Sequence, residues 1–209
     1  RDEAMDAIWS DLDLRAGDGN LRVTLSHLLK VLEPERTRGS APFLVRSSGD
    51  VLVLAGEPYL VTDLARYDDA LDRADRLTSA GSHRDALSWF ERALDLWRGT
   101  PLADVGDTTW CWDECERLRL RFVQASTRAA TLRAGLVDLD AADRLAARAI
   151  EVDPWSEDAR RVRLTVALDG GDTAAVRLAV QRCRAVLDDL GVEPSPTMAM
   201  VLRRAAPPT

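Results

Sequence analysis

The sequence has few cysteines and no long apolar run. Its 209 residues include three cysteines, an odd number without regular spacing, which argues against a secreted domain held by disulfide bonds. No stretch of about 18 apolar residues, the length needed to span a membrane, occurs without a charge. The first residues carry neither a basic segment nor the apolar core of a secretion signal. We therefore expect a cytoplasmic protein that makes no contact with a membrane.

Groups that perform catalysis or bind metals are also scarce. His27 and His83 are the only histidines, neither lies in a recognisable nucleophile motif, and no glycine-rich phosphate loop is present. Cys111 and Cys115 lack a second pair to complete a zinc site, so buried free thiols are favoured. Residues 11–22 begin like a calcium loop but lack its later oxygen ligand, glycine and glutamate. The sequence predicts a protein that is not an enzyme, with no catalytic residue, metal site or cofactor.

Charged residues are plentiful but unevenly distributed. Apolar residues make up 46% of the chain and charged residues 30%, the balance of a folded protein with a core. The net charge is −7, so the protein as a whole does not attract nucleic acid. Residues 15–46 carry a net charge of +3 and the rest of the chain −10. This asymmetry indicates two parts with different roles, and it places any nucleic-acid contact in the basic part.

The pattern of apolar residues changes near residue 57. Before it, residues 2–9 and 20–33 have the periodicity of amphipathic helices, and Gly17–Asn20 supply the expected break and cap between them. Apolar residues then alternate on either side of Ser47–Asp50, which predicts a β-hairpin. Beyond residue 57 the periodicity is helical, with breaks that contain glycine or proline. The sequence therefore predicts a mainly α-helical protein.

Small residues recur at fixed offsets in the helical part. From Ala142 to Val176 is 34 residues, the period of tetratricopeptide repeats. From Ala86 to Ala142 is 56 residues, so 22 additional residues, from Arg98 to about Arg119, separate the first two units. A generic antiparallel helical bundle is the alternative, but the glycine breaks keep phase with the repeat and favour it. The three sets are Ala86, Phe90 and Ala93; Ala142, Ala146 and Ala149; and Val176, Val180 and Cys183.

The helix expected at residues 20–33 carries the candidate DNA-binding side chains. An apolar stripe of Leu21, Leu25, Leu28 and Leu32 leaves the opposite face polar. A helix, a break, a longer helix and a hairpin match the second half of a winged helix-turn-helix, whose second helix enters the major groove while the hairpin tip touches phosphate. A surface helix with a solvated face explains the same pattern equally well. The candidate DNA-contacting residues are Asn20, Arg22, Ser26, His27 and Lys30 on the helix and Arg46 near the hairpin tip.

Six tryptophans could line a ligand cleft. Stacked helices, however, need large side chains to fill the gaps between them. A role in the core or at an interface is therefore favoured over a ligand site. The six are Trp9, Trp89, Trp97, Trp110, Trp112 and Trp155.

Several segments resemble a known family of regulators. They are Asp2–Trp9, Asn20–Leu32, Ala93–Leu102 (ALDLWRGTPL), Trp112–Leu118 (WDECERL) and Leu190–Pro196 (LGVEPSP). The first two resemble the OmpR-type winged helix of actinobacterial antibiotic regulatory proteins, and the other three resemble their bacterial transcriptional activator domain. The resemblance covers nearly the whole chain. It implies a partial winged helix-turn-helix with a β-hairpin wing at residues 1–57, a linker at 58–64 and a tetratricopeptide-like domain at 65–209.

The resemblance also implies a function. We expect a DNA-binding transcriptional regulator, or a fragment of one, that binds double-stranded DNA and whose helical repeats contact a protein partner or a second copy. The alternative is a protein-interaction module whose degenerate winged helix no longer binds DNA. The chain starts after the strands and first helix that open the family's winged helix. It also has Ser26-His27-Leu28-Leu29 where many members have Ser-Arg-Leu-Arg, and the loss of two cations weakens phosphate binding.

Overall fold

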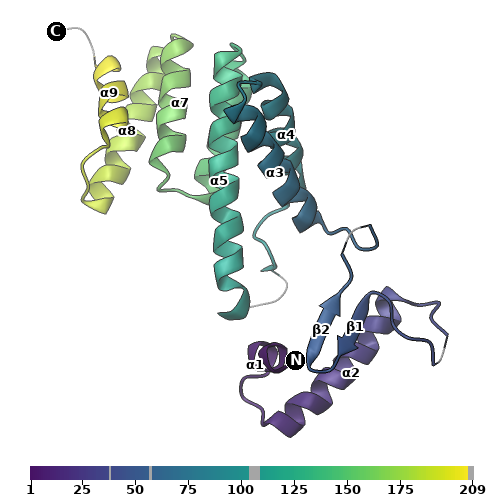
Figure 1. Cartoon of the computed structure of the whole chain (residues 1–209). Helices are drawn as coiled ribbons and strands as arrows, with labels where there is room; N and C mark the ends of the chain where they lie inside the picture. The colour runs from purple at the N-terminus through teal and green to yellow at the C-terminus, as the bar shows by residue number, and fades with distance from the viewer. Residues whose placement is uncertain (38, 57, 104–108, 207–209) are drawn as a thin grey trace. The chain divides into compact units, whose positions relative to one another are not determined.

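The computed structural model describes residues 1–37, 39–56, 58–103 and 109–206 (Figure 1). The chain divides into two compact units: an N-terminal unit of residues 1–65 and 102–114, and a repeat unit of residues 66–101 and 115–209. No pattern in the sequence indicates that the segment 102–114 groups with the N-terminal residues. The boundaries expected from the sequence, 1–57, 58–64 and 65–209, stay predictions.

The N-terminal unit contains the predicted order of two helices and a hairpin. Helix α1 spans Asp2–Ile8 and α2 spans Leu14–Leu32. Strands β1 (Val45–Ser48) and β2 (Val51–Leu54) pair antiparallel, with Ser48 opposite Val51 at the turn. A short 3₁₀ helix, η2 (Thr109–Cys111), contacts α1. The N-terminal unit therefore includes a segment, residues 102–114, that lies far from its other residues in the sequence.

The repeat unit is built from helices that follow one another as antiparallel pairs (Figure 1). Helix α7 packs against α6, α8 and α9, so the pairs stack side by side. The predicted breaks at Gly81, Gly135–Asp140, Asp153-Pro154 and Gly170-Gly171 are confirmed, because each separates two helices. The helices are α3 (Asp63–Ser79), α4 (His83–Leu96), α5 (Trp112–Gly135), α6 (Leu139–Val152), α7 (Glu157–Asp169), α8 (Thr173–Leu190) and α9 (Pro196–Arg204).

The predicted small residues lie at the centre of this stack. Ala86, Ala93, Ala142, Ala146 and Ala149 are all 0% exposed. With side chains no larger than a methyl group, two helix backbones approach closely, and larger side chains such as Phe90 fill the remaining space. In the third pair, Val176 and Cys183 are buried at the equivalent positions. The mainly α-helical repeat architecture predicted from the sequence is confirmed.

The 22 additional residues between the first two pairs are used in two ways. Those from Trp112 onward lengthen α5, which has 24 residues, whereas α6 has 14. Those from Leu102 to Glu114 belong to the N-terminal unit. Residues 104–108 of the predicted insertion lie outside the described residues. The extra length therefore contributes to both units.

The six tryptophans differ in their burial. The ring of Trp97 stacks on Phe122 at a centroid distance of 4.4 Å, and the guanidinium groups of Arg73 and Arg92 lie 4.7 and 4.5 Å from the ring of Trp89. Trp97 packs between helices as predicted, whereas Trp89 and Trp9 are half-buried. By contrast Trp110, Trp112 and Trp155 are exposed, so the predicted core role does not apply to them.

Equivalent turns join the two helices of each pair. The residue two positions before the second helix has a positive φ in all three pairs: 76° at Gly81, 64° at Val137 and 70° at Gly171. Glycine adopts this left-handed conformation at no steric cost, whereas a β-branched residue is strained there. Since the Val137 side chain is exposed, no packing compensates for the strain. The second turn is therefore a weak point of the repeat unit.

We predict that Ala86→Leu destabilises the repeat unit. A leucine at a fully buried helix crossing forces the two helices apart, which costs about 1 to 3 kcal/mol of the free energy of unfolding. Urea unfolding followed by far-UV circular dichroism measures the change. The matched control is Ser88→Leu on the exposed face of α4, which should unfold like the parent. Equal midpoints for Ala86→Leu and the parent would contradict the assigned helix contact.

We predict that Val137→Gly stabilises the repeat unit by about 1 kcal/mol, because glycine relieves the left-handed strain at an exposed position. The same urea titration detects the change as a higher midpoint. The neighbouring Leu136 does not have a positive φ, so Leu136→Gly should lower the midpoint instead. A lower midpoint for Val137→Gly would show that the turn is not strained.

Candidate nucleic-acid interface

Helix α2 begins earlier than the sequence suggests. Asp13 is its N-cap, and the Asp13 carboxylate accepts a hydrogen bond from the backbone N–H of Ala16 at 2.8 Å. The helix then continues through Gly17–Asn20, so the predicted break at these residues is wrong. Gly17 is buried against α1, and a Cβ there would lie 3.5 Å from Met5 Sδ. The glycine therefore serves a close approach of two helices and does not end one.

The packed face of α2 is rotated relative to the predicted leucine stripe. Leu21 is buried, and Leu25 and Leu32 are half-buried, as predicted. Leu28, however, is 39% exposed, while Leu29 is less exposed than Leu28. A helical wheel gives only the relative directions of side chains, and the positions of the neighbouring elements decide which edge of an apolar stripe is covered. Leu29 therefore takes the place in the packed face that was assigned to Leu28.

The structure exposes five of the six candidate residues on α2, but Arg22 lies at the edge of the packed face, in line with Leu29. Arg22, Ser26 and Lys30 are spaced by four residues and form one row along the helix. Asn20 and His27, seven residues apart, form a second row. Arg22 is not free: its guanidinium forms an ion pair with Asp18 at 2.5 Å, although its side chain is 71% exposed. The face therefore offers hydrogen-bond donors, with part of its positive charge already balanced.

Arg46, the sixth candidate residue, lies on the hairpin but not at its tip. It is on β1 and pairs with Val53, whereas Ser48 and Val51 make the last pair before the turn. Arg46 is therefore two residues before the last pair of the hairpin, near the turn. Arg46 is exposed, and its neighbour Val45 is buried, so the two side chains point to opposite faces of the hairpin.

A carboxylate that the sequence analysis missed holds the hairpin to the end of α2. One oxygen of Glu33, the residue that follows α2, accepts hydrogen bonds from the backbone N–H groups of Phe43 and Leu44 at 2.9 and 2.7 Å. Arg36 donates to the backbone oxygen of Ser40 at 2.7 Å and so braces the same loop. The two hydrogen bonds of Glu33 join residues ten and eleven positions apart, and a single glutamate gives no sequence signal for them. Glu33 fixes where the hairpin begins relative to the helix.

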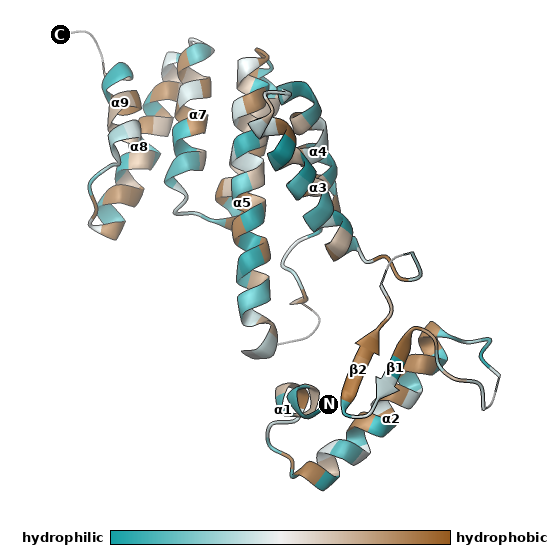
Figure 2. Ribbon diagram, in the orientation of Figure 1, coloured by the Kyte–Doolittle hydropathy of each residue, from teal (hydrophilic) through white to brown (hydrophobic). Residues whose placement is uncertain are grey.

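Apolar side chains also reach the surface of this unit. Val23 and Val31 are exposed on α2, and Val51 and Leu54 are exposed on β2. Figure 2 shows the hydrophobic character of β2 in this unit. The periodicity of the sequence predicted a polar outer face for α2, without these valines. The face of α2 is therefore mixed, with valines beside the polar rows.

The described residues hold no group of three or more histidines, cysteines, aspartates or glutamates close enough to bind a metal ion. Cys183 on α8 is a free thiol. Burial raises the pKa of the Cys183 thiol, so this side chain stays protonated and packs as an apolar residue. In the described part of the chain, no helix is long and apolar enough to cross a membrane.

Comparison with known proteins gives consistent results. The family model described as "Bacterial transcriptional activator domain" matches residues 62–204, more than half of the chain. The chain is 29% identical over 213 residues to the regulatory protein AfsR of Streptomyces coelicolor, which covers 97% of this chain and 20% of that relative. It is also similar to the structure of Mycobacterium tuberculosis EmbR in complex with a low-affinity phosphopeptide. The TM-score is 0.80 at 21% identity, over 96% of this chain and 52% of that one. The chain thus spans about a fifth of the first relative and about half of the second. The likeness to EmbR shows a shared fold.

We predict that Gly19→Ala stabilises α2 by about 0.5 to 1 kcal/mol, because glycine inside a helix costs conformational entropy. No atom lies within 4 Å of the added Cβ, so nothing opposes the change. Slower hydrogen exchange of the α2 backbone amides measures it. Gly49→Ala, in the hairpin turn at a φ of 58°, should instead destabilise the unit. Faster exchange in Gly19→Ala would mean that the helix breaks at these residues.

Proposed function

The chain belongs to the bacterial transcriptional activator domain family, and from this membership we propose that it is a cytoplasmic, non-enzymatic regulator that binds DNA. In this proposal α2 contacts double-stranded DNA, and the repeat unit contacts other proteins. The observation that carries the proposal is the exposure of Asn20, Ser26, His27 and Lys30 on the unpacked side of α2, with Arg22 at its edge and a hairpin at residues 45–54. The activity of any longer protein that contains this chain is part of the proposal.

Helix α2 has the dimensions and the chemistry of a helix that lies in the major groove. At about 1.5 Å per residue its 19 residues are roughly 28 Å long. Ser26, His27 and Asn20 supply hydrogen-bonding groups for base edges, and Arg22 and Lys30 supply positive charge. Exposed valines on the same helix suit the methyl group of thymine. Arg46 approaches a phosphate from the hairpin, and Glu33 keeps that hairpin in register with the helix.

Binding should be weak at physiological salt. Asp18 balances Arg22 on the proposed DNA-binding face, and the family resemblance places arginines where this chain has His27 and Leu29. Each phosphate contact contributes counterion release, so few cations give a low affinity with a shallow salt dependence. The net charge of −7 adds repulsion from the rest of the chain. We therefore expect regulation to depend on protein contacts made by the repeat unit.

The second candidate function is a protein-docking module with a degenerate winged helix. The exposed apolar residues of β2, together with the valines of α2, favour it, because contiguous exposed apolar side chains are typical of protein interfaces. DNA titrations at several salt concentrations separate the two candidates. A docking module retains no salt-dependent affinity for duplex DNA.

We predict that Lys30→Ala lowers the slope of log affinity against log salt by about one, because one phosphate contact is lost. Fluorescence anisotropy of a mixed-sequence DNA duplex, titrated at several salt concentrations, gives the slope. Arg76→Ala, an exposed change on α3 of the repeat unit, is the matched control and should leave the slope unchanged. An unchanged slope in Lys30→Ala removes Lys30 from the interface. If the parent chain shows no salt-dependent binding, the proposed DNA-binding function is wrong.

A further inference from the structure

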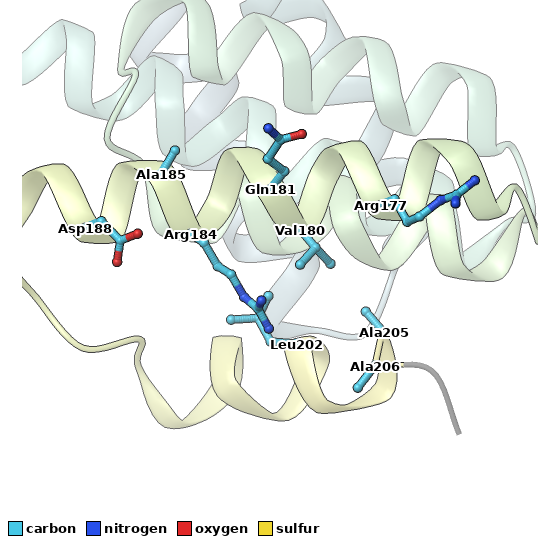
Figure 3. A pocket seen from close by; sticks show the side chains of 9 residues that line it. All are labelled: Arg177, Val180, Gln181, Arg184, Ala185, Asp188, Leu202, Ala205 and Ala206. Atoms are coloured by element: carbon cyan, nitrogen blue, oxygen red, sulfur yellow. The ribbon is translucent and has the colours of Figure 1, made fainter. Parts of the chain in front are cut away.

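A groove lies between α8 and α9 at the C-terminal end of the repeat unit (Figure 3). Its volume is about 520 Å³. Helix α9 packs against α7, and a channel is left open along α8. Val180, Leu202 and Ala205 line the groove and also pack against the buried cluster of Leu164, Val176 and Val201. The floor of the groove is therefore apolar and supported by the core.

Positive charge borders this apolar floor. Arg177 and Arg184 are two turns apart on α8 and therefore lie on the same side of the helix. Figure 3 shows the Arg184 side chain extending from α8 toward Leu202 on α9. Of the described residues that line the groove, Asp188 is the single acidic one. A groove with an apolar floor and a positive rim suits a ligand that is both apolar and acidic.

The guanidinium groups of α8 can bind a ligand, whereas those of α5 already form ion pairs within the repeat unit. On α5, each of Arg117, Arg119, Arg121, Arg128 and Arg133 forms an ion pair with a carboxylate of the repeat unit. In the part of the chain that the structure describes, no carboxylate forms an ion pair with Arg177 or Arg184. Both side chains are exposed. Two unpaired arginines at the rim of an apolar groove can bind carboxylates without first breaking an internal ion pair.

We propose that the α8–α9 groove docks an acidic amphipathic segment of a partner protein. This inference rests on the proposed role of the repeat unit in protein contacts and names the chemistry of the segment that is bound. Apolar side chains of the segment lie on Val180, Leu202 and Ala205, and its carboxylates pair with Arg177 and Arg184. Amphipathic helices that insert apolar side chains into a groove are a common mode of recognition. The volume lies within the range of about 300 to 1,000 Å³ typical of ligand pockets, enough for a few side chains.

The test uses the full chain and two synthetic helical peptides. Both have leucines spaced three and four residues apart; one has glutamate and the other lysine at every remaining position. Fluorescence anisotropy measures binding of each labelled peptide. The chain should bind the glutamate peptide and not the lysine peptide. In the double variant Arg177→Glu, Arg184→Glu, affinity for the glutamate peptide should fall by about tenfold or more, and the lysine peptide should now bind.

Arg182→Glu is the matched control, because it makes the same change of charge on α8 but lines a different groove. It should retain the affinity of the parent for the glutamate peptide. Ala206→Glu adds a negative charge at the α8–α9 groove without altering α8, and it should weaken that affinity as well.

Several outcomes overturn the proposal. If the parent and the double variant bind the glutamate peptide with equal affinity, the peptide binds elsewhere on the chain. If the parent does not bind the glutamate peptide at all, the proposal that the groove docks an acidic segment is wrong. If the double variant instead converts a dimer of the chain to a monomer in light scattering, the occupant is a second copy. If it lowers affinity for duplex DNA, the arginines bind phosphate. The DNA titration of the parent does not depend on the peptide result. A negative peptide result therefore does not contradict the proposed DNA-binding function.

Discussion

Close contact between helices at fully buried alanines is the constraint on which the repeat unit depends. Ala86, Ala142 and Ala146 occupy the second helices of successive pairs, and Ala74, Ala129 and Ala159 on neighbouring helices are equally inaccessible. Small side chains let the backbones approach, and the surrounding large side chains then pack without voids. Because the alanines set the spacing of each pair, the stacked pairs are held in register. That register positions α9 against α7 and so leaves the groove along α8.

The two units use their charged side chains in different ways. In the N-terminal unit, an N-cap at Asp13 and a close approach at Gly17 set the direction of α2, and Glu33 ties the hairpin to the end of that helix. The result is a helix with one packed face and one face of donors. Among the residues that the structure describes in the repeat unit, most arginines of the central helices pair with carboxylates, while those of α8 do not. The arginines in the middle of the repeats therefore stabilise the unit through ion pairs, and those of α8, near its C-terminal end, can bind a partner.

How much of this could be predicted from the sequence depends on the range of the interaction. The alanine spacing and glycine turns are local patterns, so the repeats and their breaks were predictable. The break at Gly17–Asn20 was wrongly predicted because glycine signals both a helix end and a close helix approach, and only the position of Met5 distinguishes them. The hydrogen bonds of Glu33, the rotation of the packed face toward Leu29 and the grouping of residues 102–114 with the N-terminal unit all depend on tertiary contacts. The exposure of the candidate residues on α2 was predictable from its periodicity, whereas the exposed valines beside them and the position of Arg46 within its strand were not.

The most direct test of the account is hydrogen exchange of the full chain with and without a mixed-sequence DNA duplex at low salt. If α2 and β1 contact DNA while the repeat unit is reserved for proteins, exchange slows in residues 14–32 and 45–48 and is unchanged across the helices from α4 to α9. Slower exchange centred on the repeat helices would contradict the division of roles. No change in residues 14–32 would contradict the assignment of α2 as the helix that binds DNA.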